Sequence, residues 1–208
     1  MDLRRDDMTA EIAAVAARFV VDEGLEYAAA KRRAVRQLGL PARTALPDNA
    51  TLEAAVREDI AVFCADHQPA ELRALRELAL VWMDRLQTFR PHLGGAVWHG
   101  TATRHSDVYV QLFCDDPKAV EWTLIDHRVE YHPGEVSGGR GEPVQALSLR
   151  HRSEALGEWV LVHLMVYGHD DLRGALKHDA QGRKPRGDAA ALRRLLADQG
   201  EARHEDAT

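Results

Sequence analysis

The sequence predicts an α+β protein, in which an N-terminal helical region precedes a mixed β-sheet unit. Two observations predict this class. Up to about residue 92 the apolar residues recur at helical spacing, and beyond it they alternate along short segments, as they do in strands. The helical unit is expected over residues 1–92 and should pack on the sheet unit of residues 93–200, whereas the polar tail 201–208 is expected to be disordered.

Four helices are expected in the first region. The first begins with an N-cap at Thr9 and ends at Gly24, and the second ends at Gly39. Asn49 or Thr51 caps a third helix, and Pro69 opens a long fourth one. The predicted inward residues, in chain order, are Ile12, Val15, Ala16, Phe19 and Val20, then Tyr27, Ala30, Ala34, Val35 and Leu38, then Leu52, Val56, Ile60 and Phe63, then Leu72, Leu75, Ala79, Trp82, Leu86 and Phe89.

The second region alternates strands with helices. Residues 108–113 alternate as a strand does, and a helix begins at Pro117. A short strand is expected at 129–131, a glycine-rich hairpin turn at 137–141, and strands at 144–150 and 159–167. A loop rich in Gly, Lys and Arg should cover 174–187, followed by a last helix at 189–197.

Composition limits the class of protein. The chain has 208 residues, 45% apolar and 29% charged, which is typical of a soluble globular protein. A net charge of -6 argues against a surface that binds polyanions everywhere, and nucleic acid would need a local basic patch. Cys64 and Cys114 are isolated and are expected in the core. Because no signal peptide or apolar run of roughly 20 residues is present, we expect a cytoplasmic protein without a membrane partner.

The segment GAVWHGTATRHSDVYV, residues 95–110, resembles the signature of the nucleotidyltransferase-fold superfamily. That signature has two glycines, a spacer of about five residues, and then S-D-x-D on a strand. The wider run from AKRRAVRQLGLP through DDPKAVEW to YGHDDLRG is similar to a proteobacterial group of nucleotidyltransferase-like proteins, sometimes labelled UDP-N-acetylmuramate–alanine ligase. The sequence does not favour that label, because it contains no G-x-x-x-x-G-K-[ST] phosphate loop.

The resemblance implies a nucleoside triphosphate site. Gly95, Gly100 and Thr101 would position phosphates, because glycine turns let backbone N–H groups approach phosphate oxygens. Ser106 would support the loop. Asp107 would be the catalytic carboxylate and a ligand of Mg²⁺.

The sequence departs from the family pattern at its catalytic positions. Ala96 stands where the family has serine, and Tyr109 replaces the second carboxylate. A third carboxylate would be expected on the late strand 159–167, where the only ionisable side chain of metal-binding type is His163. Asp107 and His163 are therefore the candidate metal ligands. Imidazole suits zinc or a transition metal better than magnesium.

Three functions follow from these observations. The first is a nucleotidyltransferase-like protein with a degenerate metal site, weakly active or only binding a nucleotide or a protein partner. The second is an active Mg²⁺-dependent nucleotidyltransferase on an acceptor that the sequence does not name. The third is a nucleic-acid-binding or regulatory module that uses the basic second helix with Lys31, Arg32, Arg33 and Arg36. The nucleic-acid-binding function ranks last, because a run of basic residues on a helix usually forms a face exposed to solvent.

Overall fold

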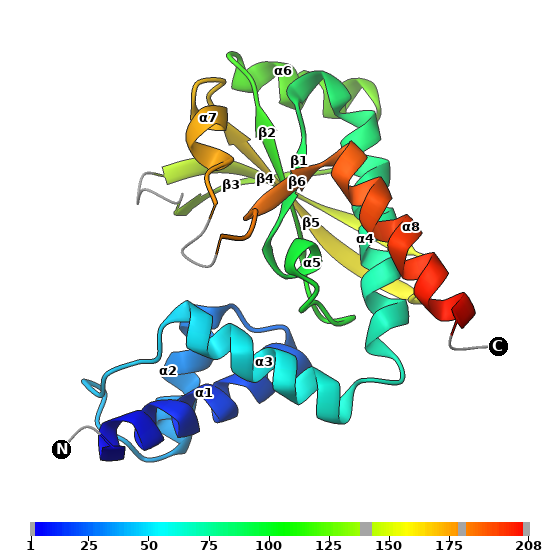
Figure 1. The fold of residues 1–208 in the computed structure, drawn as a ribbon. Helices are drawn as coiled ribbons and strands as arrows, with labels where there is room; N and C mark the ends of the chain where they lie inside the picture. Colours follow the sequence, from blue (N-terminus) through cyan, green and yellow to red (C-terminus); the bar gives the residue numbers. More distant parts are fainter. Residues whose placement is uncertain (1–2, 138–142, 179–181, 206–208) are drawn as a thin grey trace. The chain divides into compact units, whose positions relative to one another are not determined.

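The computed structural model describes residues 3–137, 143–178 and 182–205. Within them the chain forms eight α-helices and one six-stranded mixed sheet, which confirms the predicted α+β class (Figure 1). The chain divides into two compact units. Unit 1 comprises Met1–Ala70 and Thr101–Ser106, and unit 2 comprises Glu71–Gly100 and Asp107–Thr208. In these ranges no helix combines the length and apolarity needed to cross a bilayer.

Unit 1 is built from three helices, α1 (Leu3–Glu23), α2 (Tyr27–Gln37) and α3 (Asn49–Phe63) (Figure 1). Helix α1 ends at Gly24, whose φ of 67° is left-handed and suits glycine. There the N–H groups of Gly24 and Leu25 donate to the carbonyls of Val20 and Phe19. The core consists largely of small and branched residues, namely Ile12, Ala16, Ala17, Val20, Val21, Ala30, Ala34, Val35, Leu52, Val56, Ile60 and Cys64.

Two helix starts and one core residue of unit 1 differ from the prediction. Thr9 lies inside α1, which begins six residues earlier, at Leu3. Helix α3 is capped by Asp48, whose Oδ1 accepts a hydrogen bond of 2.7 Å from the Thr51 N–H. Phe63 lies at the end of α3 and is 67% exposed, whereas the adjacent Cys64 is buried as expected.

The sheet of unit 2 has the strand order β3-β4-β5-β2-β1-β6. Strands β2 and β5 are parallel, and every other neighbouring pair is antiparallel. The strands are β1 (His92–Gly94), β2 (Val108–Phe113), β3 (His132–Ser137), β4 (Pro143–Ser153), β5 (Glu158–Tyr167) and β6 (Arg186–Asp188). The helices of this unit are α4 (Gln68–Arg85), α5 (Gly95–His99), α6 (Pro117–Asp126), α7 (Asp171–Ala175) and α8 (Ala189–Glu205).

The two faces of the sheet differ in burial. Val110 pairs with Leu164 and Leu164 with Leu147, so all three share one face, and all are fully buried. Trp82 of α4 packs edge-on against His151 of this same face. Helix α8 lies beside α4 and is tied to it by an ion pair between Arg193 and Asp84 (Figure 1). On the other face, which we call the second face, Tyr109, His163 and Ser148 are half-buried.

The boundary between the units does not lie at residue 92. Helix α4 runs from the last residues of unit 1 into unit 2, and its apolar stripe belongs to the sheet unit. Residues 101–106 return to unit 1. The sequence missed this because helical periodicity shows that a helix buries one stripe but does not show which partner covers it.

Several element boundaries also differ from the prediction. The strand expected at 129–131 is β3 at His132–Ser137, because the Val129 N–H instead closes the end of α6 by donating to Leu124. The expected loop 174–187 overlaps α7 and β6 at its ends. Helix α8 continues to Glu205, into the predicted tail. The hairpin turn after residue 137 lies outside the described residues, as do residues 206–208.

Candidate functional site

The candidate site lies on the second face of the sheet, where β2, β5 and β4 are neighbours. The strand register pairs Tyr109 with His163, and His163 with Ser148. Directly paired residues point to the same face, so these three side chains form one row across the strands. Asp107 lies just before β2, two residues ahead of Tyr109. The row therefore brings two sequence-predicted residues, Asp107 and His163, to one place.

His163 is the centre of a hydrogen-bonded chain. Its Nε2 lies 3.2 Å from Oδ2 of Asp107, and its Nδ1 lies 2.8 Å from Oγ of Ser148. A carboxylate oxygen accepts, so Nε2 carries the proton and donates to Asp107. In the neutral imidazole Nδ1 then accepts from the Ser148 hydroxyl. The Tyr109 ring stacks on the imidazole with centroids 4.8 Å apart.

This arrangement does not fit a magnesium ion. Mg²⁺ takes oxygen ligands in near-octahedral geometry, and two-metal transfer sites need paired carboxylates. Asp107 instead contacts the His163 imidazole, and the phenol of Tyr109 stacks on the same imidazole. Throughout the described part of the chain, no group of three or more His, Cys, Asp or Glu side chains could hold a metal ion.

Gly95 begins helix α5 and Gly100 is its C-cap, and both have left-handed backbones, with φ of 66° and 83°. A Cβ at Gly95 would lie 3.6 Å from the Tyr109 ring, so this glycine lies beside the site. Gly100 lies away from it, near Arg76 of α4. The Arg76 guanidinium donates to the carbonyls of Val97 and Trp98 at 3.0 and 3.2 Å. Arg76 is buried, so its role is to cap α5.

Thr101 and Ser106 belong to unit 1, whereas the other predicted site residues belong to unit 2. Thr101 is 3% exposed, and its side chain hydrogen-bonds Tyr27. This placement contradicts the phosphate-facing position expected for Thr101, because the hydroxyl is buried against α2. Ser106 Oγ accepts a hydrogen bond of 3.0 Å from the Thr103 N–H, which closes the turn between these two residues.

The same loop is anchored to the helices of unit 1. The Thr103 hydroxyl donates to the Val21 carbonyl at 3.0 Å, and the Gln68 amide donates to the Ala102 carbonyl at 2.7 Å. His105 lies against Gly24, where a Cβ would come within 2.1 Å of its carbonyl oxygen. The signature segment is therefore divided: residues 101–106 are held by unit 1, whereas Gly95, Gly100 and Asp107 belong to unit 2.

The basic second helix is not the solvated cationic face that the sequence predicted. Lys31 is 7% exposed, and its Nζ donates to Asn49 Oδ1 at 2.7 Å. Burial lowers the pKa of Lys31. Arg33 pairs with Glu23 at 2.5 Å, which leaves Arg32 and Arg36 as the exposed cations of the cluster. These contacts remove most of the support for a nucleic-acid contact there.

Sequence reasoning missed Ser148 and the structural role of Arg186. A serine in a strand carries no signal by itself, and only the register places it beside His163. Arg186 in β6 donates to Gln111 on the second face, and burial lowers the pKa of its guanidinium. The last cation of the basic loop thus braces the sheet.

No family model matches the chain, and no curated protein or solved structure is significantly similar to it.

Proposed function

We propose that this chain is a nucleotidyltransferase-like protein that binds a nucleotide and has at most weak transfer activity. The observation that carries the proposal is the hydrogen bond between Asp107 and His163. It engages the carboxylate of Asp107, which would otherwise be the motif's metal ligand. Tyr109, at the position of the second carboxylate, stacks on the same imidazole. A site with this donor set can hydrogen-bond a nucleotide but cannot assemble paired metals.

The proposal predicts nucleotide binding that does not depend on magnesium. Isothermal titration with ATP, GTP, CTP and UTP should detect at least one ligand, with affinity in excess Mg²⁺ and in EDTA equal to within about threefold, since no metal bridges carboxylates and phosphates. Asp107→Ala should weaken binding by releasing His163. Asp126→Ala is the matched control, because this carboxylate is exposed at the end of α6.

Two results would overturn the proposal. One is the absence of binding of any of the four nucleotides. The other is robust Mg²⁺-dependent transfer of labelled AMP or UMP to an acceptor, abolished in Asp107→Ala, which would establish the fully active enzyme instead.

The hydrogen-bonded chain favours a second candidate, nucleophilic chemistry at Ser148. Its hydroxyl, the His163 imidazole and the Asp107 carboxylate are connected in the order seen in serine hydrolase triads. A fluorophosphonate probe tests this: Ser148 Oγ would bond to phosphorus, His163 Nδ1 would take the proton and fluoride would leave. Labelling lost in Ser148→Ala and in His163→Gln would support it, and an unlabelled wild-type protein would exclude it.

A further inference from the structure

Strand β4 places two arginines on the face of the sheet that carries the candidate site. Side chains two residues apart on a strand share a face, so Arg150 and Arg152 lie on the second face with Ser148. At about 3.4 Å per residue of an antiparallel strand, their backbones lie roughly 7 and 14 Å along β4 from Ser148. The second face therefore continues from the candidate site into a cationic strip, which we define as Arg150 and Arg152.

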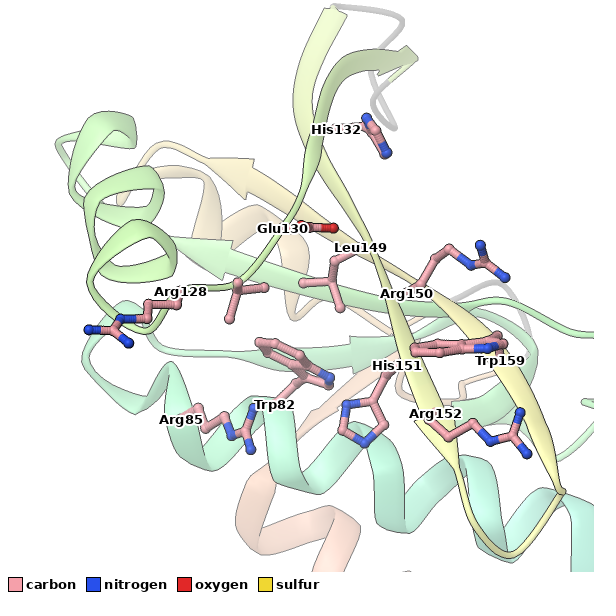
Figure 2. A pocket seen from close by; sticks show the side chains of 11 residues that line it. Trp82, Arg85, Arg128, Glu130, His132, Leu149, Arg150, His151, Arg152 and Trp159 are labelled. Carbon is pink, nitrogen blue, oxygen red and sulfur yellow. The ribbon is translucent and has the colours of Figure 1, made fainter.

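Figure 2 shows how β4 separates the side chains of the two faces. Arg150, Arg152 and Trp159 lie on one side of the strand. Trp82 and His151 lie on the other. The register agrees, because it pairs Arg152 directly with Trp159 and so places both on the second face. The pocket drawn there is thus lined from both faces, and only its second-face residues share a face with the candidate site.

The two guanidinium groups of the strip form no ion pair within the described residues, and both side chains are exposed. The Arg150 guanidinium lies 5.2 Å from the ring centroid of Trp159, which is itself 54% exposed. A cation–π contact of this kind orients a guanidinium and leaves its N–H groups available to oxygen acceptors. The strip can therefore bind the oxygens of an anionic group.

The hydrogen-bonded chain of Asp107, His163 and Ser148 is itself unsuited to phosphate groups. The His163 N–H donates to Asp107 and the Ser148 hydroxyl donates to His163, so both donors are already used. A carboxylate only accepts hydrogen bonds and repels an anion, and in the described ranges no cluster of ligands could hold a metal to bridge the two. The Asp107 carboxylate, whose side chain is 39% exposed, instead suits hydroxyl or amino donors such as those of a nucleoside.

We propose that the nucleotide lies along β4, with the hydroxyl groups of its nucleoside at Asp107 and its phosphates on the strip of Arg150 and Arg152. The inference rests on the proposed function and specifies which part of the ligand each residue binds. Guanidinium forks match phosphate oxygens, and side chains roughly 7 Å apart on one face are spaced for successive phosphates of one chain. Arg150, nearer to Ser148, binds the phosphate next to the nucleoside, and Arg152 binds the terminal phosphates.

Titration calorimetry of the full chain in EDTA tests this orientation. The probes are the tightest-binding of ATP, GTP, CTP and UTP, and the monophosphate of the same nucleoside. Arg150→Gln should weaken the binding of both probes roughly tenfold, because each loses a charge-assisted contact, whereas Arg152→Gln should weaken only the triphosphate by this factor. Asp107→Ala should weaken both probes equally, because Asp107 contacts the nucleoside that they share.

Arg85→Gln is the matched control and should leave both affinities unchanged. Arg85 is also an exposed arginine against a tryptophan ring, 5.1 Å from the centroid of Trp82, but it belongs to α4, which packs on the opposite face of the sheet. If none of the four triphosphates binds to the wild type, the proposed function and this inference are both overturned. If a triphosphate binds but Arg150→Gln and Arg152→Gln, with native circular dichroism, bind it like the wild type, only this inference is overturned. An equal loss of affinity in Arg85→Gln would also overturn it.

Discussion

Replacing Gly24 by alanine tests how the signature loop is anchored in unit 1. A Cβ at this position would lie 2.1 Å from the carbonyl oxygen of His105, and ordinary contact begins at 3.4 Å, so about 1.3 Å (3.4 − 2.1) must be recovered by movement. The loop cannot easily move, because Thr103 is bonded to both Ser106 and Val21. Overpacking should cost about 1 to 3 kcal/mol, in addition to about 1 kcal/mol for alanine at positive φ.

Gly39→Ala is the matched control. Gly39 has nearly the same φ, 66°, and belongs to the same unit, but no atom lies within 4 Å of the added Cβ. It should therefore lose only about 1 kcal/mol, the backbone contribution. Urea unfolding followed by far-ultraviolet circular dichroism gives both free energies. Equal losses in the two variants would refute the close approach of Gly24 to the loop.

Three further predictions concern stability. Because burial lowers the pKa of Lys31, the unfolded chain keeps the Lys31 proton to a higher pH than the folded chain does. The free energy of unfolding of the wild type should therefore rise relative to that of Lys31→Met as the pH approaches 10.5. Urea unfolding of both proteins at several pH values measures this difference. A hydrogen bond from the Thr51 backbone lowers the pKa of Asp48. The wild type should therefore have a larger free energy of unfolding than Asp48→Ala above pH 3.8, and this difference should disappear as the pH falls below 3.8. A difference in the free energy of unfolding that is the same in acid and at neutral pH would contradict this. Gly187→Ala would place a Cβ 2.0 Å from the Trp98 ring and should cost about 1 to 3 kcal/mol in thermal unfolding, whereas Gly134→Ala, with its nearest atom at 4.0 Å, should not show this clash.

Local signals in the sequence predicted the main elements correctly. Alternation over 108–113 became β2, and Pro117 opens α6 behind the Asp116 cap, as proline at a first helical position does. Gly24 ends α1 because its left-handed backbone allows the last carbonyls to be paired. The short strands β1 and β6 were missed because three residues are too few to show a period.

The candidate site was only partly predictable. The motif spacing indicated Asp107, and His163 stood out as the ionisable group of its strand, but nothing in the sequence paired them. Their 3.2 Å contact follows from the parallel register of β2 and β5. Thr101 was expected to face a phosphate, but its hydroxyl is buried against Tyr27. The sequence does not show this, because it does not show that the loop 101–106 belongs to unit 1.

The sequence by itself determined the α+β class and the helical periodicity, since these depend on residue type and on neighbours along the chain. Only the tertiary structure decided that α4 belongs with the sheet and that Ser148 meets His163. The physical reason is that strand register and helix packing bring together residues tens of positions apart, and no local pattern encodes those distances.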